Sequence, residues 1–113
     1  MLKTTGIVFL LIAVPAFAHG IYTGWKDPKT GLLCCNNTDC APYPAASVRP
    51  TYQSGVFGYA LATGEFIPAT RTIPSPDAEY YRCIYAWPVK NSDLGINAKV
   101  GDTRCFAAPI GAF

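Results

Sequence analysis

Residues 80–89, YYRCIYAWPV, are the strongest strand candidate in this chain, because they combine tyrosine and tryptophan with branched isoleucine and valine. Successive side chains of a strand point to opposite faces of its sheet. Cys83 therefore shares one face with Tyr85, while Arg82 shares the other face with Tyr80. The sequence predicts a strand that separates its cysteine face from its arginine face.

A second strand is predicted over residues 103–108, TRCFAA, where the same alternation separates Cys105 from Arg104. If both cysteine faces are buried, Arg82 and Arg104 project from the outer face. Two guanidinium groups on one face can hold a carboxylate or a phosphate through paired N–H donors. We therefore take Arg82, Arg104 and Tyr80 as a candidate binding face.

The segment SGVFGYALATGEFIPATRTI, residues 54–73, predicts a β-hairpin. Two short apolar runs flank residues 62–65, and Gly64 supplies a turn residue. The turn-rich segment before it, residues 19–49, has no apolar period of 3.6 residues and predicts an irregular arm. The polar residues 90–102 predict a loop. Together these patterns predict an all-β or β-rich small domain: an antiparallel sheet or partial barrel with an irregular, disulfide-pinned N-terminal arm.

Residues 1–18, MLKTTGIVFLLIAVPAFA, have the layout of a cleaved signal peptide. Lys3 precedes an apolar run over residues 7–14, and the segment ends in small residues. The run is shorter than the roughly 20 residues that cross a membrane. We expect a secreted or periplasmic protein whose single disulfide-stabilised domain covers residues 19–113, without a membrane span after cleavage.

All five cysteines lie in the expected mature chain, where an exported protein can form disulfides. The disulfide candidates are Cys34, Cys35, Cys40, Cys83 and Cys105. Adjacent Cys34 and Cys35 do not suit a bond to each other, because consecutive Cα atoms are about 3.8 Å apart and a disulfide prefers roughly 4.4–6.8 Å. We expect Cys83 and Cys105 each to be bridged to the cluster at residues 34–40. One cysteine is then left over, which makes a disulfide-linked dimer a candidate assembly, and the exact pairing stays open.

A metal site is the alternative use of the same residues. His19 would become the first residue of the mature chain, and Cys34, Cys35 and Cys40 could add soft sulfur ligands for copper or zinc. The spacing of these residues matches no zinc motif, and a metal would compete with the disulfides for the same sulfurs. The preferred interpretation therefore has no cofactor.

Charge and histidine content exclude several classes of function. Without Lys3 the chain has eight basic and seven acidic residues, which provides no basic field for nucleic acid. Its single histidine, at the start of the mature chain, does not favour a Ser-His-Asp or Cys-His site. We expect a non-catalytic exported binding or interaction module for an unknown protein or small ligand. Its many aromatic residues could stack on a sugar or on a partner protein.

The chain resembles a group of small exported bacterial proteins of unknown function. The resemblance is carried by AHGIYTGW, CCNNTDCAP, GEFIP, SPDAEYYRC and TRCFAAP, a CCxxxDC box with two later single cysteines. It implies export to the periplasm or beyond, and it brings no activity. Members of the group often carry a histidine shortly before the fourth cysteine, where this chain has Tyr81 or Arg82. That difference counts against a metal site.

Overall fold

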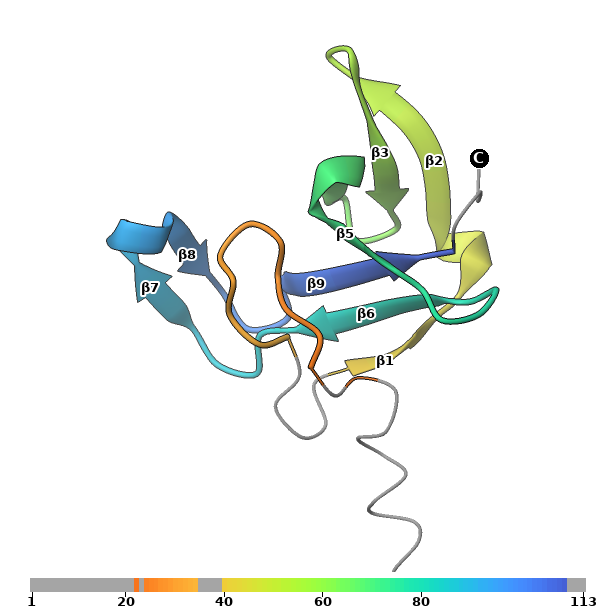
Figure 1. The fold of residues 1–113 in the computed structure, drawn as a ribbon. Coiled ribbons are helices and arrows are strands. Elements are labelled where there is room, and N and C mark those ends of the chain that lie inside the picture. Colours follow the sequence, from red (N-terminus) through yellow and green to blue (C-terminus); the bar gives the residue numbers. More distant parts are fainter. Residues whose placement is uncertain (1–21, 23, 35–39, 110–113) are drawn as a thin grey trace, which may run out of the picture.

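The computed structural model describes Tyr22, residues 24–34 and residues 40–109, and it confirms a β-rich domain (Figure 1). Three short 3-10 helices interrupt the series of strands in these residues, and none of the helices there has the length and apolar character of a membrane span. The elements are β1 Cys40–Tyr43, η1 Ala45–Ser47, β2 Val48–Gln53, β3 Val56–Leu61, β4 Phe66–Pro68, η2 Ala69–Arg71, β5 Thr72–Pro74, β6 Tyr80–Ile84, β7 Val89–Asn91, η3 Ser92–Leu94, β8 Ile96–Ala98 and β9 Thr103–Ala108.

The central sheet has the strand order β1-β6-β9-β5. Strand β6 is antiparallel to both β1 and β9, whereas β5 runs parallel to β9. The predicted strands at residues 80–89 and 103–108 are therefore neighbours, with Cys83 opposite Cys105. Strand β6 ends at Ile84, before the predicted limit, and a bulge shifts its register with β9 at that residue.

A second sheet, of order β2-β3-β4, packs on one face of the central sheet. It contains the predicted hairpin, whose turn between β3 and β4 has Gly64 at a φ of 96°. The buried cluster between the sheets joins residues from both: Tyr59, Leu61, Ile67, Tyr80, Phe106 and Ala108. Phe106 is 1% exposed, and its ring stacks on that of Tyr80 with centroids 5.7 Å apart. This aromatic layer is the main core.

The N-terminal arm covers the opposite face of the central sheet. Trp25 packs against Tyr81 with ring centroids 5.8 Å apart, and Cys34 is bonded to Cys105. Strand β6 is thus covered on both faces, by the arm and by the second sheet (Figure 1). The outer, solvent-facing side expected for Arg82 does not exist, because the second sheet lies over it.

Two disulfides join the cysteine cluster to the central strands. Besides the Cys34–Cys105 bond, Cys40 of β1 is bonded to Cys83 of β6, its direct partner in register. Each strand cysteine is therefore bridged to the 34–40 segment, in agreement with the sequence prediction.

Several strands lie in segments that the sequence analysis assigned to irregular structure. The predicted arm extends to residue 49, but β1 begins at Cys40 and β2 at Val48. Both carry proline, which sheets accept on edge strands, and both are edge strands here. Strand β1 forms by pairing with β6, and β2 forms by pairing with β3. Local amino-acid composition does not predict such long-range pairing.

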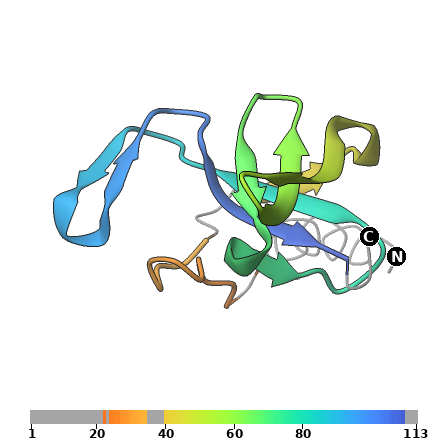
Figure 2. The ribbon, with the colours of Figure 1, turned by 90° about the horizontal axis from the view of Figure 1, so that it is seen from above.

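The predicted loop at residues 90–102 also contains structure. Strands β7 and β8 form a hairpin that projects beyond the two packed sheets, as Figure 2 shows. Asn91 accepts hydrogen bonds from the backbone N–H groups of Asp93 and Leu94, and Gly95 adopts a φ of 70° to close the turn. Buried Ile96 and Ala98 pack on Tyr85, which anchors the hairpin to the end of β6.

Gly58 provides a test of the close packing between β3 and β4. A methyl group at this position would lie 2.7 Å from Cζ of Phe66 and 2.9 Å from Cα of Pro68. Because backbone atoms must then move, we expect Gly58→Ala to lower the free energy of unfolding by about 1–3 kcal/mol. Chemical denaturation measures the change, with Gln53→Ala at an exposed site of β2 as the control, expected within about 0.5 kcal/mol of wild type. Equal stability of the two variants would contradict the packing described.

Candidate functional site

A cleft of about 310 Å³ lies between the N-terminal arm and the β7–β8 hairpin. We call it the arm–hairpin cleft. Its walls come from the arm loop and from β8, and its remaining surface comes from the β3–β4 turn, η2 and the start of β9. The polar residues that line it are Asp27, Lys29, Thr30, Glu65, Arg71, Asn97, Asp102 and Thr103.

Asp27 shapes the arm wall of the cleft. Its backbone oxygen accepts a hydrogen bond from the N–H of Gly31 at 2.7 Å, and its Oδ1 accepts one from the N–H of Lys29 at 2.9 Å. Gly31 has a φ of 77°, which favours glycine at this turn. The side chain of Asp27 is only 2% exposed, and its Oδ2 lies 3.5 Å from Nη2 of Arg71. A buried carboxylate is thus paired with an arginine, as its desolvation requires.

Arg71 connects the arm to the central sheet. Its Nη2 donates to the backbone oxygen of Arg104 at 3.1 Å and to that of Thr103 at 3.4 Å, in addition to pairing with Asp27. Its Nε is buried and has no hydrogen-bond partner among the described residues. One guanidinium therefore holds together η2, β9 and the arm loop.

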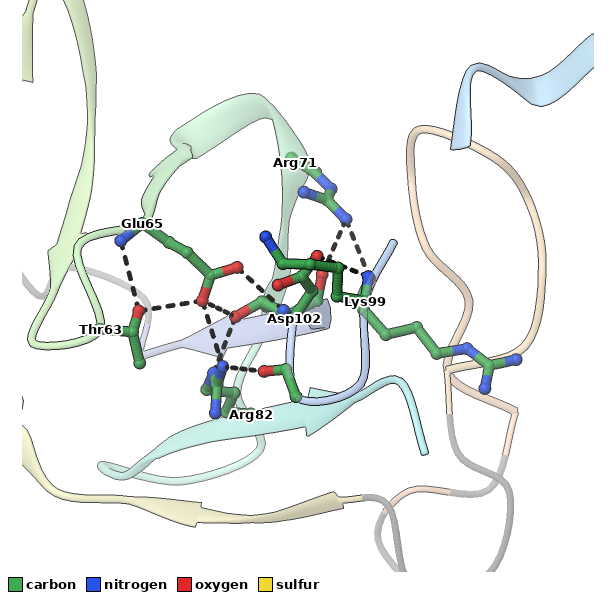
Figure 3. Close-up of polar contacts among 9 residues, drawn as sticks. Thr63, Glu65, Arg71, Arg82, Lys99 and Asp102 are labelled. Carbon is green, nitrogen blue, oxygen red and sulfur yellow. Dashed lines mark hydrogen bonds and ion pairs between the residues drawn. The ribbon is translucent and has the colours of Figure 1, made fainter. Parts of the chain in front are cut away.

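Glu65 also lines the cleft, and Figure 3 shows the polar contacts around its carboxylate. Its Oε2 accepts from the backbone N–H of Thr103 at 2.9 Å, and its Oε1 accepts from the Thr103 hydroxyl at 2.7 Å. Oε1 also accepts from the Thr63 hydroxyl at 2.9 Å and from Nη2 of Arg82 at 3.1 Å. Arg82 in turn donates from Nε to the Thr103 hydroxyl and from Nη2 to the oxygen of Gly101, each at 2.7 Å.

This network lowers the pKa of Glu65. Partial burial raises the pKa, but the hydrogen bonds from Thr103, Thr63 and Arg82 outweigh it, so the pKa lies below the ordinary value of 4.5. The carboxylate is therefore ionised at neutral pH and stabilises the junction of the two sheets.

A smaller apolar pocket, of about 80 Å³, adjoins the cleft and shares Asp27, Thr30 and Tyr85 with it. Its other lining residues are Leu32, Trp87, Val89 and Arg104. Trp87 is 55% exposed and Leu32 is 43% exposed.

The three residues of the predicted binding face lie in different surroundings. Tyr80 is buried in the main core. The side chain of Arg82 is 15% exposed and its guanidinium lies 5.6 Å from the Tyr43 ring centroid. The guanidinium of Arg104 lies 5.6 Å from the ring centroid of Tyr85, and Arg104 lines the small pocket. The second sheet and the β6–β9 bulge explain why alternation along a regular strand did not anticipate these positions.

The sulfurs of Cys34 and Cys40, two of the candidate metal ligands, are joined in disulfides and so are not thiolates. The other two candidates, His19 and Cys35, lie outside the described residues. Among residues 22, 24–34 and 40–109, no group of three histidine, cysteine or acidic side chains is arranged to hold a metal ion.

Sequence analysis did not single out the residues that build the cleft. Asp27 falls in the predicted irregular arm and Glu65 in the predicted hairpin turn, and neither they nor Arg71 were candidates for a site. The Asp27-Pro28 pair does signal the turn that shapes the arm wall. No local pattern pairs Asp27 with Arg71 or Glu65 with Thr103, because the fold brings these distant segments together.

No protein-family model, curated protein or solved structure matches this chain significantly.

The low pKa of Glu65 predicts an acid-dependent loss of stability. A carboxylate whose pKa is lower in the folded state stabilises the fold above its ordinary pKa and loses that contribution as pH falls through the folded value. We expect Glu65→Gln to cost about 1–3 kcal/mol at pH 7, because Arg82 and Thr103 lose a charged acceptor. Below pH 4.5 the difference in free energy of unfolding between Glu65→Gln and wild type should become smaller.

Denaturation curves measured from pH 7 downward test this expectation. The hydrogen bond from Tyr81 also lowers the pKa of Asp77. Asp77 is present in wild type and in Glu65→Gln, so the difference between their free energies of unfolding isolates the contribution of Glu65. Glu79→Gln, at the chain's other glutamate and an exposed site, is the matched control. If the loss of free energy of unfolding caused by Glu65→Gln did not change with pH, it would not come from the charge of the Glu65 carboxylate, which would contradict this expectation.

Proposed function

We propose that this protein is an exported, non-catalytic binding module that holds its ligand in the arm–hairpin cleft. The signal-like segment 1–18 supports export, and so do the two intramolecular disulfides, which persist in oxidising compartments. The bound partner is a small ligand or the side chains of a protein.

The observation that carries this proposal is the cleft itself, with the exposed apolar residues at its border. Its volume of about 310 Å³ lies at the lower end of the usual range for ligand pockets, roughly 300–1,000 Å³. Trp87 and Leu32 line the adjoining pocket and leave large apolar surface in solvent. Tryptophan is among the residues that contribute most to binding interfaces.

The carboxylates of the cleft favour binding over catalysis. A general acid or base works best with a pKa near the operating pH. Glu65 has a lowered pKa and accepts hydrogen bonds on both oxygens, so it is a weak base already engaged by the fold. Asp27 is paired with Arg71, and Oδ2 of Asp102 accepts from the N–H of Lys99 at 2.8 Å. These carboxylates act as structural acceptors.

Filling the cleft tests the proposed function. Asn97 is exposed on β8 and lines the cleft, so Asn97→Trp should obstruct it without disturbing the core. Wild-type protein purified from the exporting cell, incubated with envelope extract and analysed by native mass spectrometry, should retain a defined, chemically unchanged ligand. Asn97→Trp should lose that ligand.

Gln53→Trp, on the β2–β3 hairpin away from the cleft, is the matched control and should retain the ligand. If both variants kept the same ligand, the binding site would lie elsewhere. Conversion of the ligand into a product would contradict a non-catalytic role.

A further inference from the structure

The chemistry of the arm–hairpin cleft points to a neutral saccharide of one or two rings as its ligand, an inference that we draw from this structure and that rests on the proposed function. Saccharides present many hydroxyl groups, each a donor and an acceptor, around rings whose C–H faces are apolar. Their recognition needs mixed polar groups beside an aromatic surface. The cleft and its adjoining pocket combine these features.

The polar lining suits hydroxyl groups better than a charged ligand. Three carboxylates, of Asp27, Glu65 and Asp102, face two cations, of Lys29 and Arg71, so their charges nearly cancel. The carboxylates would repel a polyanion, and the lysine and arginine would repel a polycation. A neutral ligand avoids both conflicts and can still use donors and acceptors.

Several polar groups are positioned to bind hydroxyls. The exposed amide of Asn97 offers two donors and an acceptor at the hairpin wall. On the arm wall, Thr30 carries a hydroxyl and Lys29 an exposed ammonium group. Both walls border the cleft, so a sugar ring held in it would have polar groups of the arm and of the hairpin available to its hydroxyls.

The aromatic surface comes from the adjoining pocket. Trp87 is 55% exposed and borders the pocket together with Tyr85, which also lines the cleft. Indole and phenol rings combine apolar faces with a polar tip. A sugar ring extending from the cleft could stack on Trp87 while its hydroxyls bind the polar wall.

The geometry is less suited to a peptide. Extended peptides are commonly bound by adding a strand to a sheet edge, where backbone hydrogen bonds supply affinity. The strand that lines the cleft, β8, has only three residues, Ile96–Ala98, and so offers few backbone groups. The cleft's predominantly polar lining also lacks the continuous apolar groove that a peptide helix requires.

Titration with defined sugars, followed by NMR, tests this inference. The probes are maltose, cellobiose and N,N′-diacetylchitobiose, with trigalacturonic acid as the anionic comparison. We expect saturable binding of at least one neutral disaccharide, with a shift of the Trp87 indole N–H signal. The other tryptophan, Trp25, packs against Tyr22 and Tyr81 and its signal should not move.

Substitutions then locate the site. Trp87→Ala should weaken the binding at least tenfold, about 1.4 kcal/mol, and Asn97→Ala should weaken it as well. The control is Tyr52→Ala, which removes an aromatic residue that is 69% exposed on the β2–β3 hairpin, and it should leave affinity unchanged. Equal effects of Trp87→Ala and Tyr52→Ala would overturn the assignment.

Further results would overturn the saccharide assignment, and they distinguish its failure from a failure of the proposed function. Failure of every neutral sugar on a broad glycan array, or binding of trigalacturonic acid alone, would reject a neutral saccharide. A phage-displayed peptide that binds wild type but not Asn97→Trp would reject the saccharide yet retain the binding module. If neither sugars nor peptides bound in the cleft, and Asn97→Trp retained the ligand captured from extract, both proposals would fail.

Discussion

The covalent joining of the N-terminal segment to the central strands is the constraint on which the rest of the structure depends. Cys40 and Cys83 are bonded across β1 and β6, and Cys34 reaches β9 through Cys105. A domain this small buries a limited core, and disulfides offset that limit by restricting the unfolded chain. The bonds also fix which segment covers which face of the sheet, leaving the aromatic core to the opposite face.

The cleft is a consequence of this arrangement. The Cys34–Cys105 bond and the Asp27–Arg71 pair hold the arm against the sheet, while Tyr85 anchors the hairpin that forms the other wall. Glu65 ties the second sheet to the start of β9 beneath them. The interactions that stabilise the fold therefore also set the width of the cleft. Because the cleft carboxylates take part in these interactions, they serve as structural hydrogen-bond acceptors.

The sequence predicted the parts of the fold that local chemistry encodes. The aromatic strand containing Cys83, the strand containing Cys105 and the glycine turn after Leu61 are all present, and both strand cysteines are bridged to the 34–40 segment. It did not predict β1 or the second sheet's position over Arg82, because both depend on pairing between distant segments. The cleft was missed for the same reason, since the residues that line it come from widely separated parts of the chain.

Disulfide mapping of the exported protein, without reduction and after blocking free thiols, tests the central constraint most directly. Cleavage before Asp39 separates Cys34 and Cys35 from Cys40, and fragmentation spectra distinguish the adjacent pair. We expect Cys34 joined to Cys105 and Cys40 joined to Cys83. A bond between Cys40 and Cys105, or three or more blocked thiols, would contradict this pairing.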